Sequence, residues 1–74
     1  MRKNETAIGI GQRLVELRGI RTRTGVAKAL GIGYSSLCNY ENGIRIPPDR
    51  IKIRIADYYG VSVQDIFFRQ NTTK

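Results

Sequence analysis

Apolar residues recur at helical spacing from the start of the chain. In the segment 8–18, Ile10, Leu14 and Leu17 repeat at intervals of four and three residues, which is the stripe of an amphipathic helix. Gly19 follows directly, and glycine commonly ends a helix. The pattern therefore predicts a first helix over residues 8–18.

The segment 26–43, VAKALGIGYSSLCNYENG, predicts two short helices that cross at a tight turn. Each helix carries one apolar stripe, namely Val26, Ala27 and Leu30 on the first and Leu37 and Tyr40 on the second. Gly31 can take the left-handed conformation that ends the first helix, and the hydroxyl of Thr22 or Thr24 can cap its beginning. Such a helix-turn-helix is a common means of laying one helix in the major groove of DNA.

Two adjacent prolines precede the segment 49–59, which predicts a fourth helix. Residues 51–55 (IKIRI) alternate apolar and basic side chains, a pattern that taken alone is typical of a β-strand. The helical interpretation is favoured, because it places Ile51, Ile55 and Tyr58 on one stripe and because the prolines would disrupt a hairpin. It puts further apolar side chains beside that stripe, namely Ile53, Ala56 and Tyr59.

The last predicted helix is short. Ser62 and Asp65 resemble a capping box with Asp in place of Glu, which opens a fifth helix that runs through Phe67. The chain is therefore expected to form an all-α, compact five-helix domain over residues 7–68, between flexible tails at 1–6 and 69–74.

The charge of the chain narrows its partners. The 74 residues carry 13 Lys and Arg against 6 Asp and Glu, which gives a net charge of +7, so polyanions are the expected partners. The lone Cys cannot form an intramolecular disulfide, and with no His and no nucleophile–base set we expect no metal, no cofactor and no catalytic site. No apolar run reaches the roughly 18 residues that span a bilayer, and the start lacks a signal-peptide core, which indicates a cytoplasmic protein without membrane contact.

Together these segments resemble the lambda-repressor-like, Cro/C1-type helix-turn-helix regulators, also called the xenobiotic-response-element family. The matching segments are IGQRLVELR (10–18), VAKALGI (26–32), SLCNYENG (36–43) and IADYYGVSVQDIFF (55–68). They cover nearly the whole chain. The resemblance implies a five-helix domain that binds operator DNA as a homodimer.

The third predicted helix carries the candidate base contacts. Because Leu37 and Tyr40 form its buried stripe, Ser35 and Asn39 are forced onto the opposite face. Asn can pair bidentately with adenine, and Ser can donate to or accept from several base edges. The resemblance implies base contacts at Tyr34, Ser35 and Asn39, and a base or phosphate contact at Ser36. Tyr34 departs from the small or amide residues common at its position, and a packing role stays open for it.

Candidate phosphate contacts are assigned from charge and placement around this helix. They are Arg21, Arg23, Lys28, Asn42 and Arg45. The family commonly has Gln where Arg23 stands, and that Gln both bonds a phosphate and supports a base-contacting side chain on the third helix. Arg23 is expected to keep the phosphate contact and to lose the support. The connection before Val26 is shorter than in the family, and Ile20 is expected to fill the gap in the core. The resemblance also implies a partly buried ion pair between Arg18 and Glu41.

A terminal apolar cluster is the candidate dimer interface, with sealing of the core as its alternative role. The cluster comprises Val61, Val63, Ile66, Phe67 and Phe68. A domain this small can bury one of the two Phe rings but seldom both, so one ring is expected to meet a partner.

These observations predict a sequence-specific transcriptional regulator, a repressor, that binds an inverted-repeat operator in double-stranded DNA as a homodimer. It is expected to act on the nucleoid, and no small-molecule effector is evident. Two alternatives stay open: an antitoxin-like or other protein-interaction module with secondary DNA binding, and a non-specific nucleic-acid binder. The neutral hydrogen-bonding pair Ser35 and Asn39 argues against the second, because a purely electrostatic binder gains nothing from it.

Overall fold

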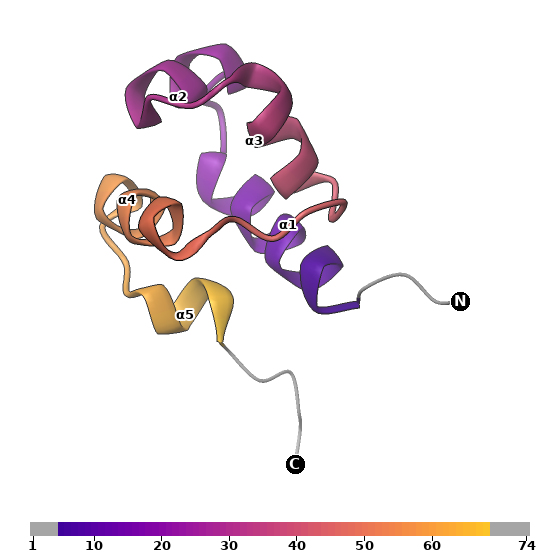
Figure 1. Cartoon of the computed structure of the whole chain (residues 1–74). Coiled ribbons are helices and arrows are strands. Elements are labelled where there is room, and N and C mark those ends of the chain that lie inside the picture. The colour runs from indigo at the N-terminus through magenta and orange to yellow at the C-terminus, as the bar shows by residue number, and fades with distance from the viewer. Residues whose placement is uncertain (1–4, 69–74) are drawn as a thin grey trace.

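The computed structural model describes residues 5–68, and these residues form five helices and no strand (Figure 1). The helices are α1 (Glu5–Arg18), α2 (Arg23–Leu30), α3 (Tyr34–Glu41), α4 (Asp49–Tyr59) and α5 (Val63–Phe67). This confirms the all-α prediction, including the helical interpretation of residues 51–55. The predicted start of the first helix was wrong by three residues, because α1 begins at Glu5 and takes in two residues assigned to the tail. Residues 1–4 and 69–74, which include the rest of both predicted tails, lie outside the described residues.

The predicted helix ends are present in the structure. Of the two threonines that could cap α2, Thr22 is the cap, and its Oγ1 accepts a hydrogen bond from the amide of Gly25 at 3.0 Å. Ser62 caps α5 in the same way, with Oγ accepting from the amide of Asp65 at 3.0 Å. Gly31 ends α2 with φ 72°, in the left-handed region that favours glycine. These short-range hydrogen bonds set where the helices begin and end.

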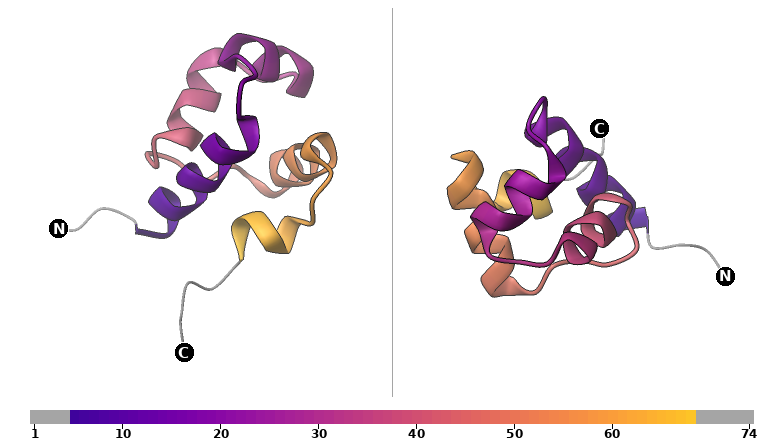
Figure 2. Two further views of the ribbon diagram at one scale, coloured as in Figure 1. Left: turned by 180° about the vertical axis from the view of Figure 1, so that it is seen from behind. Right: turned by 90° about the horizontal axis from the view of Figure 1, so that it is seen from above.

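The five helices close a ring around one core. Contacts link α1 with α3, α3 with α2, α2 with α4, α4 with α5, and α5 with α1. Figure 1 and the left view of Figure 2 both show α3 and α5 on different sides of α1. Every described helix therefore packs against two others, although none is longer than 14 residues.

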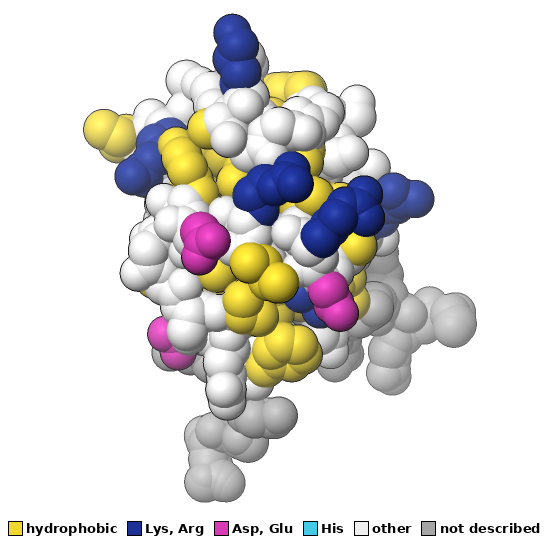
Figure 3. All heavy atoms as spheres, turned by 60° about the vertical axis from the view of Figure 1, so that its left-hand side comes forward, with side chains coloured by type: hydrophobic (Ala, Val, Ile, Leu, Met, Phe, Trp, Pro, Cys, Tyr) yellow, Lys and Arg dark blue, Asp and Glu magenta, His cyan; other side chains and the backbone are white. Residues whose placement is uncertain are grey.

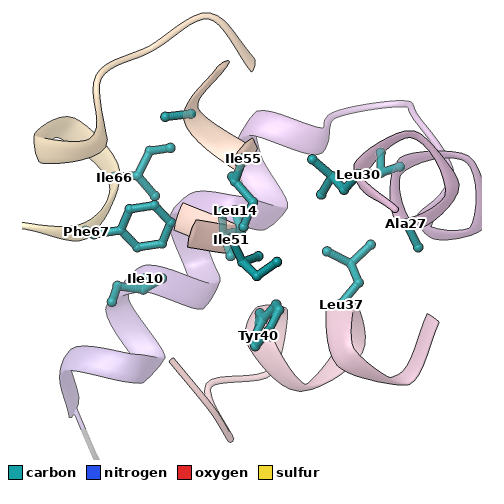
Figure 4. Close-up of a cluster of buried hydrophobic side chains, with 12 residues drawn as sticks. Ile10, Leu14, Ala27, Leu30, Leu37, Tyr40, Ile51, Ile55, Ile66 and Phe67 are labelled. Atoms are coloured by element: carbon teal, nitrogen blue, oxygen red, sulfur yellow. The ribbon is translucent and has the colours of Figure 1, made fainter. Parts of the chain in front are cut away.

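The core is built from the apolar stripes that the sequence shows. It consists of Ile10, Leu14, Val26, Ala27, Leu30, Leu37, Tyr40, Ile51, Ile55, Ala56, Ile66 and Phe67, most of which are labelled in Figure 4. Two expectations were wrong. Ile20 is fully exposed and fills no gap, and Ile53 points to solvent because the buried face of α4 is narrower than predicted.

Helix α1 lies against the end of α3 at a glycine. A Cβ built on Gly11 would lie 2.8 Å from the carbonyl oxygen of Tyr40 and would also clash with the carbonyl of Glu41. The turn after α3 approaches the same helix, since Gly43 has φ 77° and a Cβ there would lie 2.8 Å from the Cα of Ile8. Two small residues thus allow α3 to lie directly on the backbone of α1.

Candidate nucleic-acid interface

Helix α3 has a buried side and a polar outer side. Leu37, Tyr40 and Glu41 are buried, whereas Tyr34 and Ser35 are exposed. Three of the predicted base-contacting side chains make no hydrogen bond to any described residue, namely Ser35, Ser36 and Asn39. Ser36 and Asn39 are half-buried at the edges of this outer side. The helix therefore presents unused hydrogen-bonding groups outward.

The turn that follows α3 is folded back onto the helix. The backbone amides of Ile44 and Arg45 donate to the carbonyl oxygen of Asn39 at 2.9 and 3.2 Å, and the amide of Asn42 donates to that of Cys38 at 2.8 Å. The side chains of Asn42 and Arg45 are exposed. Two of the predicted phosphate-contacting residues are thus fixed at the carboxyl end of α3.

Glu41, the last residue of α3, has a fully buried carboxylate on the inner side of the helix. Glu41 has a side-chain exposure of 0%, and each of its oxygens accepts from a different arginine. Arg18 Nε lies 2.9 Å from Oε2, and Arg23 Nε lies 2.8 Å from Oε1. The pair between Arg18 and Glu41 that the resemblance implied is therefore present, and Arg23 is a second partner that it did not imply.

Arg23, a predicted phosphate contact, is not a free cation in the structure. Besides its bond to Glu41, its Nη1 lies 3.8 Å from Cys38 Sγ, also on α3. The hydrogen bond to Glu41 raises the pKa of Arg23 above its ordinary value. Its charge is thus already compensated within the fold.

Arg21, another predicted phosphate contact, also has partners within the fold. Its guanidinium lies over the rings of Tyr58 and Tyr59, 5.7 and 5.6 Å from their centroids, and its Nη1 donates to the carbonyl oxygen of Leu17 at 3.3 Å. Arg21 therefore turns toward the end of α4 rather than toward α3. The cation–π contacts and the hydrogen bond compete with any phosphate for the same guanidinium.

Two other arginines each donate a hydrogen bond to a backbone carbonyl at the end of another helix, and the sequence analysis predicted neither contact. Arg54 on α4 donates from Nη1 to the carbonyl oxygen of Leu30 at 3.0 Å, at the end of α2. Arg13 on α1 donates from Nε to the carbonyl oxygen of Ile66 at 2.7 Å, near the end of α5. Such carbonyls lack a partner within their own helix. No local pattern marks the two arginines, since the partners are 24 and 53 residues away.

Of the remaining cations in the described part, only Lys52 has such partners, with Nζ 3.6 Å from Asp49 Oδ1 and near the rings of Phe67 and Phe68. Lys28, Arg45 and Arg50 are exposed and make no ion pair, hydrogen bond or ring contact with a described residue through their side chains. Figure 3 shows one face, on which Lys and Arg side chains lie mainly in the upper half with hydrophobic side chains between and below them. The positive charge available to a polyanion is therefore smaller than the composition suggests.

The terminal apolar cluster divides between core and surface. Ile66 and Phe67 are buried, with Phe67 only 4% exposed, so the expectation that these two lie at a dimer interface is wrong for the folded monomer. Phe68 is 56% exposed, while Val61 and Val63 are half-buried. The expectation that only one of the two rings would be buried is confirmed. Lys52 Nζ lies 4.9 Å from the centroid of the exposed ring.

Other kinds of site find no support in the part of the chain that the structure describes. Residues 6–68 contain no group of three or more potential metal ligands of the His, Cys, Asp or Glu type.

A surface cleft between α1 and α5 is lined by Arg13, Glu16, Leu17, Val61, Asp65 and Ile66. Among the described helices, none has the length and apolar character to cross a membrane.

The comparisons with known proteins agree with this geometry. The family model described as Helix-turn-helix (HTH_3) matches residues 8–66, and the chain belongs to this family of Cro/C1-type helix-turn-helix proteins. This confirms the resemblance found in the sequence. Membership of the family indicates a DNA-binding transcription regulator rather than an enzyme.

One solved structure supports the fold. The chain is similar to the solution structure of the SOS-response transcriptional repressor LexA from Eubacterium rectale, with a TM-score of 0.84 and 20% sequence identity over 100% of this chain and 85% of that chain. At that identity the similarity concerns the fold alone. No match was found among curated protein sequences.

Proposed function

We propose that this protein is a sequence-specific transcriptional repressor that binds operator DNA as a homodimer, with α3 in the major groove. The observation that carries the proposal is the outer side of α3, where the polar groups of Ser35, Ser36 and Asn39 have no partner in the described structure. Occupation of a promoter by the bound dimer would block transcription.

Base recognition is assigned to the outer side of α3. Asn39 can pair bidentately with adenine, and the serines can bond several base edges, each good contact being worth about 1–3 kcal/mol of discrimination. Tyr34 stands at the first turn with an exposed ring, which can contact a thymine methyl group. Sequence discrimination is then the product of a few side chains on one helix.

Phosphate binding is assigned to Lys28, Asn42 and Arg45. All three are exposed, and the side chains of the two cations have no partner among residues 6–68. Phosphate contacts set the register of the protein on the duplex and make affinity depend on salt. A dimer uses each contact twice, so a steep loss of affinity with salt is expected.

Dimerisation is assigned to the surface around Phe68, with Val61 and Val63 at its edge. The ring of Phe68 is exposed and Val61 and Val63 are only half-buried, which leaves apolar area that a second copy can cover. A two-fold dimer would place two α3 helices about one DNA turn, roughly 34 Å, apart. The operator would then be an inverted repeat.

Selection of binding sites from a random duplex library at about 150 mM salt tests the proposal, because non-specific binding is weak there. An inverted repeat with half-sites about one turn apart is the expected result. Recovery of no motif by the folded protein would contradict operator binding and would favour a partner-binding module.

Two substitutions test the division between base and phosphate contacts. Asn39→Ala should flatten the preference among sequences and leave non-specific binding nearly intact, whereas Arg45→Ala should weaken binding to all DNA and lower the salt slope by about one for each bound copy. Equal losses on every sequence for both variants would remove Asn39 from base recognition.

Sedimentation tests the dimer surface. Phe68→Ser should shift the protein toward monomer, while Ile20→Ser, which alters a fully exposed apolar residue in the turn after α1, should leave the dimer intact. If neither change alters an observed dimer, the interface lies elsewhere. A monomeric wild-type protein at the concentrations that bind DNA would reject the homodimer.

A further inference from the structure

Arg23 touches α3 at two points rather than facing solvent alone. It is the first residue of α2, and its Nε donates to Glu41 Oε1 at 2.8 Å. Its Nη1 lies 3.8 Å from the sulfur of Cys38. Residues 38 and 41 are one helical turn apart on α3, so this guanidinium lies along the side of the helix. Its side chain is 31% exposed, which leaves part of it in contact with solvent.

The carboxylate of Glu41 forms an ion pair through each of its two oxygens. Arg18, the last residue of α1, holds Oε2 through Nε at 2.9 Å, and its Nη1 donates to the carbonyl oxygen of Arg21 at 2.9 Å. One ion pair would let the carboxylate pivot about a single oxygen. Two pairs on different oxygens, from the end of α1 and the start of α2, fix the plane of the carboxylate and hence the rotation of α3 about its own axis.

The rotation of α3 decides whether a base contact can form. Asn39 lies two residues before Glu41 on the same helix, with its side chain on the outer edge. A side-chain tip about 5–6 Å from the helix axis moves by about 1 Å when the helix turns by about 10°. Hydrogen bonds to base edges tolerate only a few tenths of an ångström.

We propose that Arg23 is a positioning residue for sequence recognition, which acts through Glu41 and Cys38 to set the rotation of α3 rather than by binding a phosphate. The proposal rests on the proposed function. It separates the cations around α3 into two groups: Arg23 serves discrimination between sequences, while exposed Lys28 and Arg45 serve overall affinity.

Matched substitutions on α2 test the proposal. Arg23→Gln and Lys28→Gln remove the same charge from the same helix, but only Arg23 has partners on α3 among the described residues. Binding to the selected operator and to a shuffled duplex is measured by fluorescence anisotropy over a salt series. The ratio of the two affinities reports discrimination, and the dependence on salt reports phosphate contacts.

For Arg23→Gln the expected result is about a tenfold loss in the affinity ratio with an unchanged salt slope, since a misplaced helix loses base contacts. For Lys28→Gln the ratio should stay at the wild-type value and the slope should fall by about one for each bound copy. A lower slope with an unchanged ratio in Arg23→Gln would overturn the proposal and make this residue a phosphate contact.

Glu41→Gln provides a second variant that keeps the positive charge of Arg23. A phosphate-binding Arg23 would keep or improve its contact once released from Glu41, so the operator ratio would not fall. If Arg23 is a positioning residue, Glu41→Gln should lower the ratio of operator to shuffled-duplex affinity. The double variant Arg23→Gln with Glu41→Gln should then lose no more of that ratio than the worse single variant. Additive losses would contradict the coupling through Glu41.

Thermal melts show whether a lower affinity ratio comes from unfolding of the variant. All ratios are measured well below the melting temperature of each variant, where the folded fraction is near one and a merely structural loss leaves the ratio unchanged. A wild-type protein that shows no preference for any duplex would overturn the proposed function and this inference with it. A wild-type preference together with an unchanged ratio in both Arg23→Gln and Glu41→Gln would overturn the inference alone.

Discussion

Replacing Gly11 with alanine tests how closely α1 and α3 must approach. The new Cβ would lie 2.8 Å from the carbonyl oxygen of Tyr40 and 2.9 Å from the carbonyl carbon of Glu41. Both are backbone atoms, so the clash is relieved only when α3 moves away from α1. The carbonyl oxygen of Glu41 would be closer still, and since ordinary contact begins near 3.4 Å, α3 must move by about 1 Å at that point.

The magnitude follows from two opposing effects. Alanine is better than glycine inside a helix by about 1 kcal/mol, whereas overpacking of this kind costs about 1–3 kcal/mol and more when backbone must move. We expect Gly11→Ala to lower the free energy of unfolding by about 1–2 kcal/mol. For a domain of this size, that is a fall of roughly 5–15 °C in melting temperature.

Gly9 offers a matched control on the same helix. A Cβ there meets nothing within 4 Å, so Gly9→Ala should show only the gain in helix propensity, about 0.5–1 kcal/mol. Thermal and urea unfolding of the two variants, followed by circular dichroism, measures the difference. A Gly11→Ala protein as stable as Gly9→Ala would show that the close approach of α1 and α3 is not needed.

Two further predictions concern single hydroxyl groups. The hydroxyl of Tyr59 is buried without a hydrogen-bond partner in the described structure, so Tyr59→Phe should raise stability near neutral pH by about 1 kcal/mol, and a loss of that size in urea unfolding would show that the hydroxyl has a partner. Burial raises the pKa of Tyr59 above 10.0, so the unfolded chain loses the phenol proton at a lower pH than the folded protein does. The stability that comes from this pKa difference is fully present below about pH 10 and is lost as the pH rises through the folded pKa. Unfolding at about pH 11 should therefore show a loss of stability in the wild type that is absent in Tyr59→Phe. Thr22→Ala removes the cap of α2 and should cost about 1 kcal/mol, whereas Thr24→Ala, an exposed position inside the helix, should cost nothing measurable in the same thermal melts; equal losses would contradict the assigned cap.

Much of the fold could be predicted because its signals are local. Thr22 and Ser62 each bond an amide three residues ahead, and Gly31 ends α2 through its own backbone conformation. Apolar stripes at helical spacing identified nearly the whole core. The same periodicity failed for Ile53, because the width of a buried face depends on which helices pack there.

The outer side of α3 was also predictable, since the buried stripe of a helix determines its opposite face. Leu37 and Tyr40 are buried, and Ser35 is exposed, as the pattern indicated. The positive charge was less informative. The composition counts cations but does not show which of them remain free for a phosphate.

The sequence by itself determined the five helices, most of the core and the family to which the chain belongs, because periodicity, capping and turn signals act over a few residues. Only the tertiary structure decided that Arg23 joins Arg18 on Glu41 and that Arg54 reaches the end of α2. It also decided that Gly11 lies beneath α3. Such contacts join residues far apart in the chain, and their geometry exists only after the helices have packed.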